Sequence, residues 1–200
     1  MARYRAAVIG LGRMGSTIDD AVTRAGTVYV PFAHGPSYHY SPLVDLVAGA
    51  DIHPEQRSLF GERWGLSGDH LYSDYTEMLE KERLDIVSVC TTARHRAAIV
   101  QDVARAGAKA IWAEKPMCLS LEEADAMVRV CHDNGVRLAI NCSRRWHPLY
   151  TEAVGIIEAG DIGDLLQVTA YGHTDLSHNS HLLDAVSLLA RGDVQWVFGE

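Results

Sequence analysis

Short, continuously apolar runs alternate along the chain with longer segments in which apolar residues recur at helical spacing. Continuous apolar runs are typical of strands in a parallel sheet that helices cover on both faces. The pattern therefore predicts a doubly wound α/β fold. The expected strands are 4–10, 43–51, 85–91, 109–116 and 136–142, and the expected helices between them are 14–26, 54–65, 94–107 and 120–135.

Two local signals support the expected helix ends. Several helical segments finish in Ala-Gly or Asn-Gly, where glycine permits the left-handed conformation that ends a helix. The stretch LSLEEA places Ser120 three residues before Glu123, which is a capping-box pattern for a helix start.

The pattern changes after the stretch SRRWHP, residues 143–148. A helix is expected over 149–160, a strand over 164–172 and a further helix over 181–192. This succession is typical of the start of a second α/β unit that stops early. We therefore predict two domains, 1–145 and 146–200.

One connection is unusually long for a compact domain. Residues 27–42, TVYVPFAHGPSYHYSP, contain three prolines, four aromatic residues and two histidines. Long connections are often functional. A functional loop and an insertion that merely packs on the surface both remain open.

Composition narrows the class of protein. The formal net charge is −8, and acidic and basic residues are interleaved, which argues against a nucleic-acid-binding surface. No apolar run is long enough for a membrane span or resembles a signal peptide, so we expect a cytoplasmic protein. The cysteines show no C-x-x-C spacing and are expected to be free thiols rather than disulfides or zinc ligands; they are Cys90, Cys118, Cys131 and Cys142.

The stretch AVIGLGRMGSTI places three glycines in the order G-x-G-x-x-G between an expected strand and an expected helix. Gly10 permits a tight turn, Gly12 lets backbone N–H groups approach a pyrophosphate, and Gly15 lets the helix pack closely on the sheet. Arg13 and Met14 complete the loop. We predict a dinucleotide-binding loop; a glycine-rich turn without a ligand is the alternative.

Asp51, at the end of the second expected strand, bears on which dinucleotide binds. A carboxylate there accepts hydrogen bonds from ribose hydroxyls and repels a 2′-phosphate, which favours NAD over NADP. Arg13 could reach a phosphate, so NADP remains possible. The spacing from the glycines exceeds the usual roughly 20 residues, and the long connection accounts for the excess. A helix N-cap ahead of PEQR is the alternative interpretation of Asp51.

Glu114, Lys115 and Pro116 directly follow an expected strand, at the carboxyl edge where open α/β sheets bind ligands. A lysine there can hydrogen-bond an oxygen whose carbon gains or loses hydride. Pro116 would stiffen the turn and could adopt a cis bond. Taken alone, a Glu-Lys pair is more often a solvated surface pair.

The glycine loop and the Glu-Lys-Pro turn together resemble the glucose–fructose oxidoreductase/inositol dehydrogenase (Gfo/Idh/MocA) family of nicotinamide-dependent oxidoreductases. Further segments follow in the family's order, namely HGPSYHYSPLVDLVAGAD, LDIVSVCTT, NCSRRWHP, EAGDIGDLLQV and HLLD. The resemblance implies a dehydrogenase acting on a sugar, a cyclitol or a related polyol. It implies an NAD(P)-binding Rossmann domain over 1–145, part of a substrate and oligomerisation domain over 146–200, and a homo-oligomer.

The same resemblance implies roles for individual residues. Lys115 would hold the reacting oxygen, and His181 would exchange the proton, a role that suits the near-neutral pKa ordinary for histidine. The other implied site residues are Thr91 and Glu114, which would border the nicotinamide half of the cofactor, and Asp184 and Arg145, which would line the substrate site.

Three features depart from the family's pattern. Ser177 stands where many catalytic members carry an aspartate. TTARHR replaces a TPN-containing stretch and places Arg96 where its histidine would fall. Family members also usually continue much further, so either the natural protein is short or this is a truncated form.

These departures keep other functions open. One alternative is a non-catalytic dinucleotide-binding sensor or scaffold. Another is an enzyme that keeps its cofactor bound and uses transient oxidation for elimination or hydrolysis. His181 could instead be a structural histidine at the domain junction. The spacing of His173, His178 and His181 does not match H-E-x-x-H, so we predict no metal site.

Overall fold

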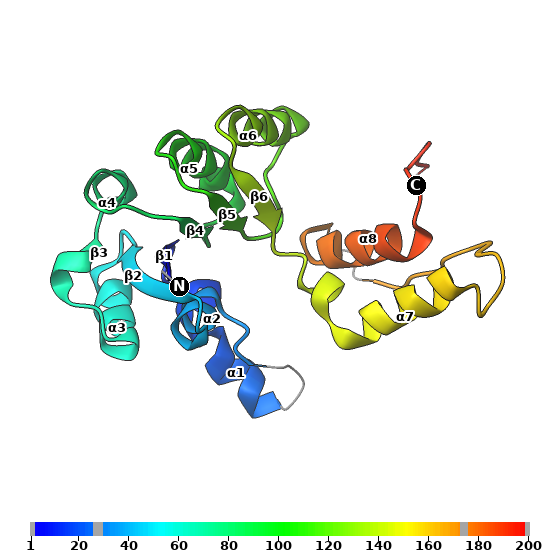
Figure 1. Cartoon of the computed structure of the whole chain (residues 1–200), viewed down its shortest axis with the longest axis horizontal. Helices are drawn as coiled ribbons and strands as arrows, with labels where there is room; N and C mark the ends of the chain where they lie inside the picture. Colours follow the sequence, from blue (N-terminus) through cyan, green and yellow to red (C-terminus); the bar gives the residue numbers. More distant parts are fainter. Residues whose placement is uncertain (1–2, 26–29, 173–175, 199–200) are drawn as a thin grey trace. The chain divides into compact units, whose positions relative to one another are not determined.

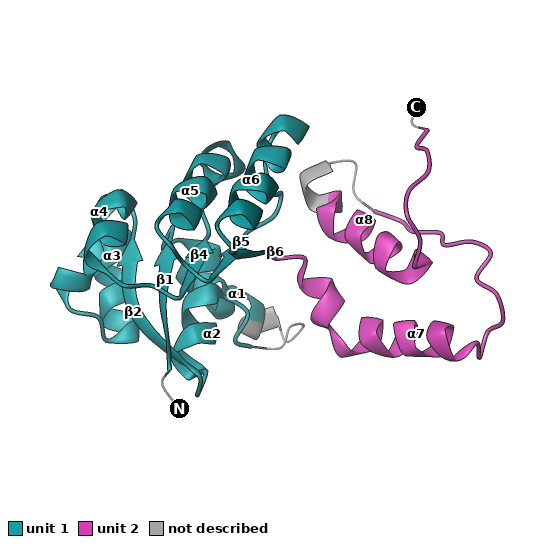
Figure 2. Cartoon of the chain, turned by 45° about the horizontal axis from the view of Figure 1, so that its top comes forward, with its two compact units in different colours: residues 1–140 teal, residues 141–200 magenta. Residues whose placement is uncertain are grey.

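The computed structural model describes residues 3–25, 30–172 and 176–198. The chain divides into two compact units, residues 1–140 and residues 141–200 (Figure 2). Each unit is described by itself. The predicted domains, 1–145 and 146–200, stay a prediction.

Unit 1 is built on a six-stranded parallel sheet with the strand order β3-β2-β1-β4-β5-β6 (Figure 1). This order confirms the predicted doubly wound sheet. From β1 the successive strands β2 and β3 are added on one side, and β4, β5 and β6 are added on the other. Sheets of this kind open a crevice at the carboxyl ends of their strands where the strand order changes sides, here between β1 and β4. The strands are β1 Tyr4–Ile9, β2 Val44–Ala50, β3 Leu71–Tyr72, β4 Ile86–Val89, β5 Ala110–Ala113 and β6 Arg137–Ile140.

Helices cover both faces of the sheet (Figure 1). One face carries α1 Ile18–Ala25, α2 His34–Tyr40 and α3 Pro54–Trp64, and a π-helical turn, Arg13–Thr17, leads into α1. The other face carries α4 Tyr75–Lys81, α5 Ala93–Arg105 and α6 Leu121–Asp133. A 3₁₀ turn, Gly68–His70, precedes β3.

The Ser120 half of the capping box predicted at the start of α6 is present, and its reciprocal bond is displaced by one residue. The Ser120 hydroxyl accepts the Glu123 N–H at 3.2 Å, and the Glu123 carboxylate accepts the Leu119 N–H at 2.8 Å. The Ser120 bond satisfies one N–H group that the helix itself leaves without a partner, and the Glu123 bond satisfies the N–H of the residue before the N-cap.

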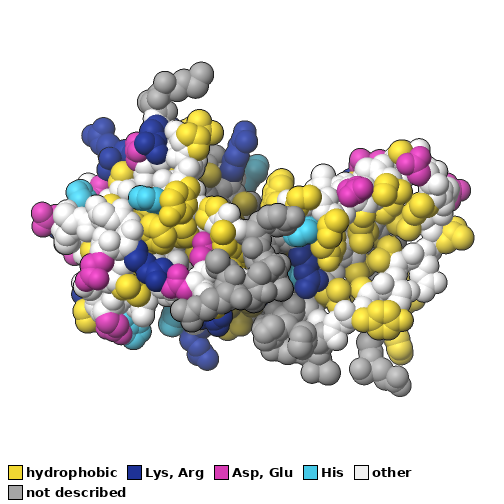
Figure 3. All heavy atoms as spheres, turned by 90° about the horizontal axis from the view of Figure 1, so that it is seen from below, with side chains coloured by type: hydrophobic (Ala, Val, Ile, Leu, Met, Phe, Trp, Pro, Cys, Tyr) yellow, Lys and Arg dark blue, Asp and Glu magenta, His cyan; other side chains and the backbone are white. Residues whose placement is uncertain are grey.

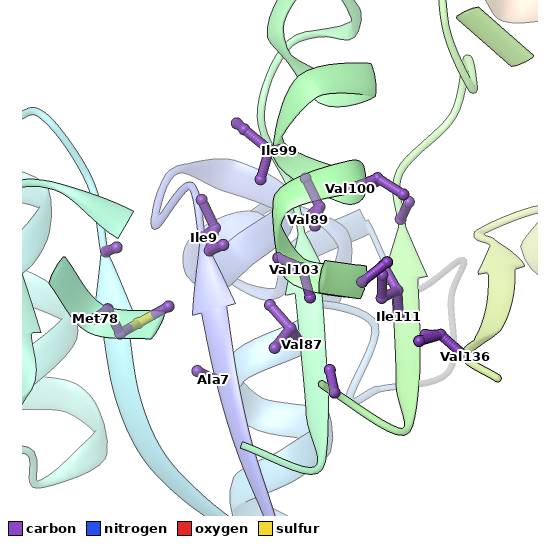
Figure 4. Close-up of a cluster of buried hydrophobic side chains, with 14 of the residues drawn as sticks. Ala7, Ile9, Met78, Val87, Val89, Ile99, Val100, Val103, Ile111 and Val136 are labelled. Carbon is purple, nitrogen blue, oxygen red and sulfur yellow. The ribbon is translucent and has the colours of Figure 1, made fainter. Parts of the chain in front are cut away.

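Two hydrophobic clusters fill the space between the sheet and its helices. The larger lies under α4, α5 and α6 and includes the fully buried side chains of Met78, Val87, Val89, Val100 and Val103 (Figure 4). The smaller lies on the other face and includes Val8, Leu11, Tyr38 and Phe60. The strands are apolar on both sides because both of their faces are covered.

The pattern of the sequence missed three elements of unit 1. Helix α2 forms inside the connection expected over 27–42, whose first three residues lie outside the described part. Strand β3 and helix α4 were not expected. Strand β3 is only two residues long, which leaves no period to detect, and its place depends on pairing with Gly49 and Ala50 of β2.

Unit 2 contains a 3₁₀ turn, Ser143–Trp146, and two helices, α7 Pro148–Ala159 and α8 Leu176–Ala190. The strand expected over 164–172 is not formed: the described residues 164–172 have no regular structure. A strand needs a neighbour to pair its backbone groups, and the described part of this unit offers none.

Unit 2 exposes many apolar side chains (Figure 3). Leu166 and Tyr171 belong to the apolar pattern that predicted a strand over 164–172, and their side chains are 94% and 93% exposed. The start of a second α/β unit therefore stays a prediction, and only its strand over 164–172 is absent from the described residues. Among the helices described in either unit, none combines the length and apolarity needed to cross a membrane.

The burial of the core side chains predicts how far a cavity-forming substitution lowers the free energy of unfolding. Ile111, in β5, is 1% exposed, so Ile111→Ala should lower the free energy of unfolding by about 2–5 kcal/mol through lost burial and a cavity. Leu121→Ala, a control at an 85% exposed position, should change it by less than about 0.5 kcal/mol. Urea denaturation of both variants measures the difference. Equal losses would contradict the described core.

Candidate functional site

The glycine loop begins where β1 ends. Gly10 donates its N–H to the Ala50 carbonyl at 2.8 Å and has a φ of +89°, a conformation that glycine adopts without strain. A Cβ on Gly10 would lie 2.9 Å from the Cys90 carbonyl carbon. Side chains are thus excluded where the loop passes between β2 and the end of β4.

Gly15 brings the start of the helix against the strand. A Cβ at this position would lie 2.1 Å from the Gly10 carbonyl oxygen, closer than any real contact. Gly12 is different, because a Cβ there would meet nothing within 4 Å. The fold therefore requires glycine at Gly15, whereas the space beside Gly12 is open for a ligand.

Asp51 fastens this loop to the end of β2. One carboxylate oxygen accepts the Leu11 N–H at 2.7 Å, and the other accepts the His53 N–H at 2.9 Å. The N-cap of α3 is His53, so the alternative interpretation of Asp51 as that N-cap is wrong. A carboxylate has about four acceptor positions, so two used by the backbone leave capacity for hydroxyl groups.

A cavity of about 570 Å³ opens at this edge of the sheet. Its lining joins the glycine loop, the end of β2 and the loop after β4, and includes Gly10, Gly12, Asp51, Thr91 and His95. Four residues predicted from separate parts of the sequence are thus brought together. Arg13 is exposed and Met14 half-buried; neither lines this cavity.

The Glu-Lys-Pro turn follows the next strand, β5. Glu114 is 4% exposed, and its carboxylate accepts the Lys115 N–H at 3.2 Å. The alternative of a solvated surface pair is therefore wrong for Glu114. The Lys115 side chain is half-buried, and its ammonium group has no hydrogen bond or ion pair within the described part of the chain. The Lys115–Pro116 peptide bond is cis.

Glu114 contacts a series of buried, hydrogen-bonded polar side chains that the sequence analysis did not predict. The other Glu114 oxygen lies 3.2 Å from His34 Nε2, and His34 Nδ1 lies 2.8 Å from the Ser88 hydroxyl. The Tyr38 hydroxyl lies 2.7 Å from the same Ser88 oxygen. Burial raises the pKa of Tyr38, so this hydroxyl stays protonated.

The described part of residues 27–42 does not merely pack on the surface, and a functional role for this segment stays a prediction. The described part of that segment carries His34 and Tyr38 into the core, where the His34 ring packs on Trp112 at 3.8 Å between ring centroids. The density of aromatic residues and histidines was the available signal. The partners could not be found, because Glu114 lies 80 residues away in the sequence.

The remaining predicted residues belong to unit 2. Arg145 Nε donates to the Asp184 carboxylate at 2.6 Å, which joins the 3₁₀ turn to α8. His181 is half-buried one turn before Asp184 on the same helix. His173, and the side chains of Ser177 and His178, lie outside the description. No group of three or more potential metal ligands occurs among the residues that were described.

Comparison with known proteins gives a family match. The model of the Gfo/Idh/MocA oxidoreductase family, NAD-binding Rossmann fold, matches residues 4–142. This range contains the glycine loop, Asp51, Thr91 and the Glu-Lys-Pro turn.

Individual relatives agree with this match. The chain is 35% identical over 119 residues to D-apiose dehydrogenase of Paraburkholderia graminis, covering 60% of this chain and 31% of that protein. It is 32% identical over 173 residues to the NAD⁺-dependent scyllo-inositol 2-dehydrogenase of Bacillus subtilis, covering 80% of this chain and 42% of that protein. The chain thus spans 31% and 42% of the lengths of these two relatives.

A solved structure shows the same fold. The oxidoreductase from Agrobacterium radiobacter, in complex with NAD⁺, L-tartaric acid and magnesium, superposes with a TM-score of 0.67 at 23% identity. The match covers 82% of this chain and 42% of that one.

The surroundings of Gly15 and Gly12 predict a large and a small loss of stability, respectively, on substitution by alanine. Gly15→Ala should lower the free energy of unfolding by about 3 kcal/mol or more, because its Cβ meets the Gly10 carbonyl. Gly12→Ala should cost less than about 1 kcal/mol, because its Cβ meets nothing. Thermal unfolding measures both, and a Gly12 variant as unstable as the Gly15 variant would contradict this geometry.

Proposed function

The chain belongs to the Gfo/Idh/MocA family of oxidoreductases with an NAD-binding Rossmann fold, and from this premise we propose an NAD-dependent dehydrogenase of polyols. The reaction would move a hydride between the cofactor and a carbinol carbon of a sugar, a cyclitol or a related polyol. The observation that carries the proposal is the glycine loop that Asp51 fastens beside an open cavity at the carboxyl edge of the sheet.

The residues around the loop fit a dinucleotide. The open space beside Gly12 would admit a pyrophosphate next to backbone N–H groups at the start of the helix, where negative charge is favoured. Asp51 would accept the hydroxyls of the adenosine ribose. Its negative charge supports NAD over NADP, because a 2′-phosphate at this position would face a carboxylate.

Bound NAD would supply the hydride acceptor, and two side chains would supply the rest of the chemistry. The Lys115 ammonium would donate a hydrogen bond to the substrate oxygen and stabilise negative charge as it develops. His181 would take the hydroxyl proton as the hydride leaves the carbon, so the alcohol becomes a carbonyl. Thr91 and Glu114 would border the nicotinamide, and Arg145 and Asp184 would position substrate hydroxyls.

The relatives support the substrate class. Two of them are named for D-apiose and scyllo-inositol, a sugar and a cyclitol. The cytoplasmic location and the homo-oligomer expected from the sequence belong to the same proposal.

NADH binding tests the nucleotide site. We expect NADH to bind with at least about tenfold higher affinity than NADPH in a fluorescence titration. Gly12→Ala should weaken NADH binding at least about tenfold without loss of stability, because its Cβ would occupy the space for the pyrophosphate. Gly68→Ala, at an equally open glycine away from the cavity, should leave the affinity within about twofold. A folded, cofactor-free protein that binds neither nucleotide would contradict the proposal.

Turnover tests the catalytic assignment. In the longest natural protein that contains this chain, Lys115→Met should lower kcat with inositol or apiose by about 10²–10⁴-fold and leave the NADH affinity within a few-fold. Lys81→Met, at an exposed lysine, should leave both unchanged.

NADH binding without turnover of any polyol would favour the non-catalytic sensor or scaffold. Cofactor that stays bound through purification and is not consumed would favour elimination or hydrolysis through transient oxidation.

A further inference from the structure

We propose that Arg96 is a positioning residue that ties the loop after β4 to the Glu-Lys-Pro turn and thereby sets the nicotinamide side of the cofactor site. The inference rests on the proposed function. It assigns a task to the residue that stands where the family's pattern has a histidine.

The guanidinium of Arg96 bridges two backbone segments. Arg96 lies in the first turn of α5 and is 2% exposed. One terminal nitrogen donates to the Thr91 carbonyl, five residues before it, and the other donates to the Pro116 carbonyl, twenty residues after it. Thr91 lies in the loop after β4 that lines the cavity, and Pro116 directly follows Lys115.

This placement is energetically unfavourable without those contacts. A buried guanidinium loses its hydration, and burial lowers the pKa of Arg96, with the nearby Glu114 carboxylate acting in the opposite direction. A positive charge in the first turn of a helix also opposes the helix dipole. The two carbonyl bonds and the field of Glu114 are the interactions that offset these costs.

Arg96 differs in this respect from other arginines of the same helix. Arg94 is exposed at the rim of the cavity, and Arg105 is exposed in the last turn, where it pairs with Asp102. Arg96 alone among these three directs its donors to the backbone of two separate loops. Its fork of nitrogens makes this possible, because a lysine could reach only one of the carbonyls with similar geometry.

The consequence concerns the distance between two functional groups. The backbone of Thr91 and the backbone beside Lys115 are joined through one rigid planar group. The start of the Glu-Lys-Pro turn is held separately, because the Glu114 carboxylate accepts the Lys115 N–H and contacts His34. Loss of Arg96 should therefore free the two loops from each other while the glycine loop and Asp51 keep their own hydrogen bonds.

The test compares two ligands that differ on the nicotinamide side. NADH spans the whole proposed site, whereas ADP-ribose lacks the nicotinamide ring. Arg96→Met, which keeps length but has no donors, should weaken NADH binding about tenfold and leave ADP-ribose binding within about twofold. Arg96→Lys should recover part of the loss. Arg105→Met, the same change on the exposed end of α5, should leave both affinities unchanged.

Two results would overturn the assignment. Equal weakening of NADH and ADP-ribose would show that Arg96 supports the domain in general, and unchanged NADH binding would show that the bridge is not needed. If Arg96→Met does not fold, the same comparison is made with Arg96→Lys, which should weaken NADH alone.

A ligand-free measurement separates this inference from the proposed function. If the unaltered protein binds neither ligand, the proposed function fails, and amide hydrogen exchange without ligand decides the role of Arg96. The bridge predicts faster exchange over residues 114–120 in Arg96→Lys than in the unaltered protein, with residues 10–17 unchanged. Equal exchange over 114–120 would overturn the bridge.

Discussion

The close contact of Gly15 with the Gly10 carbonyl fixes the geometry of the glycine loop, on which the proposed nucleotide site depends. Only a hydrogen atom fits between the start of the helix and the strand, because a Cβ on Gly15 would come within 2.1 Å of that oxygen. The close approach brings the start of the helix next to Gly12, beside which a Cβ would meet nothing within 4 Å. Asp51 accepts the Leu11 N–H, so protein contacts of its own hold the shape of the loop.

A second constraint acts at the neighbouring strands, where polar groups are buried rather than exposed. Glu114 lies between the backbone of Lys115 and the ring of His34, and Ser88 and Tyr38 extend the chain of contacts into the core. Buried polar groups are costly unless each finds a partner. Glu114, His34 and Arg96 contact the Glu-Lys-Pro turn, and their contacts restrict the backbone beside Lys115, as the role proposed for Lys115 requires.

Much of the Rossmann half could be predicted from the sequence, because its signals are local. Continuous apolar runs predicted five of the six strands, and three glycines at fixed spacing predicted the loop after β1. The short strand β3 and helix α2 were missed because tertiary pairing and burial determine them. The strand expected over 164–172 failed for the opposite reason: its pattern was present, but its described surroundings offer no strand to pair with. The partners of His34 and Arg96 could not be predicted, since contacts across 80 and 20 residues leave no periodic trace.

A crystal structure of the chain with NADH tests the central claim most directly. We expect the pyrophosphate beside Gly12 at the start of the helix, and the adenosine ribose hydroxyls within hydrogen-bond distance of Asp51. The nicotinamide should then lie toward Thr91 and Lys115. A nucleotide bound elsewhere, with the space beside Gly12 occupied only by water, would contradict the account.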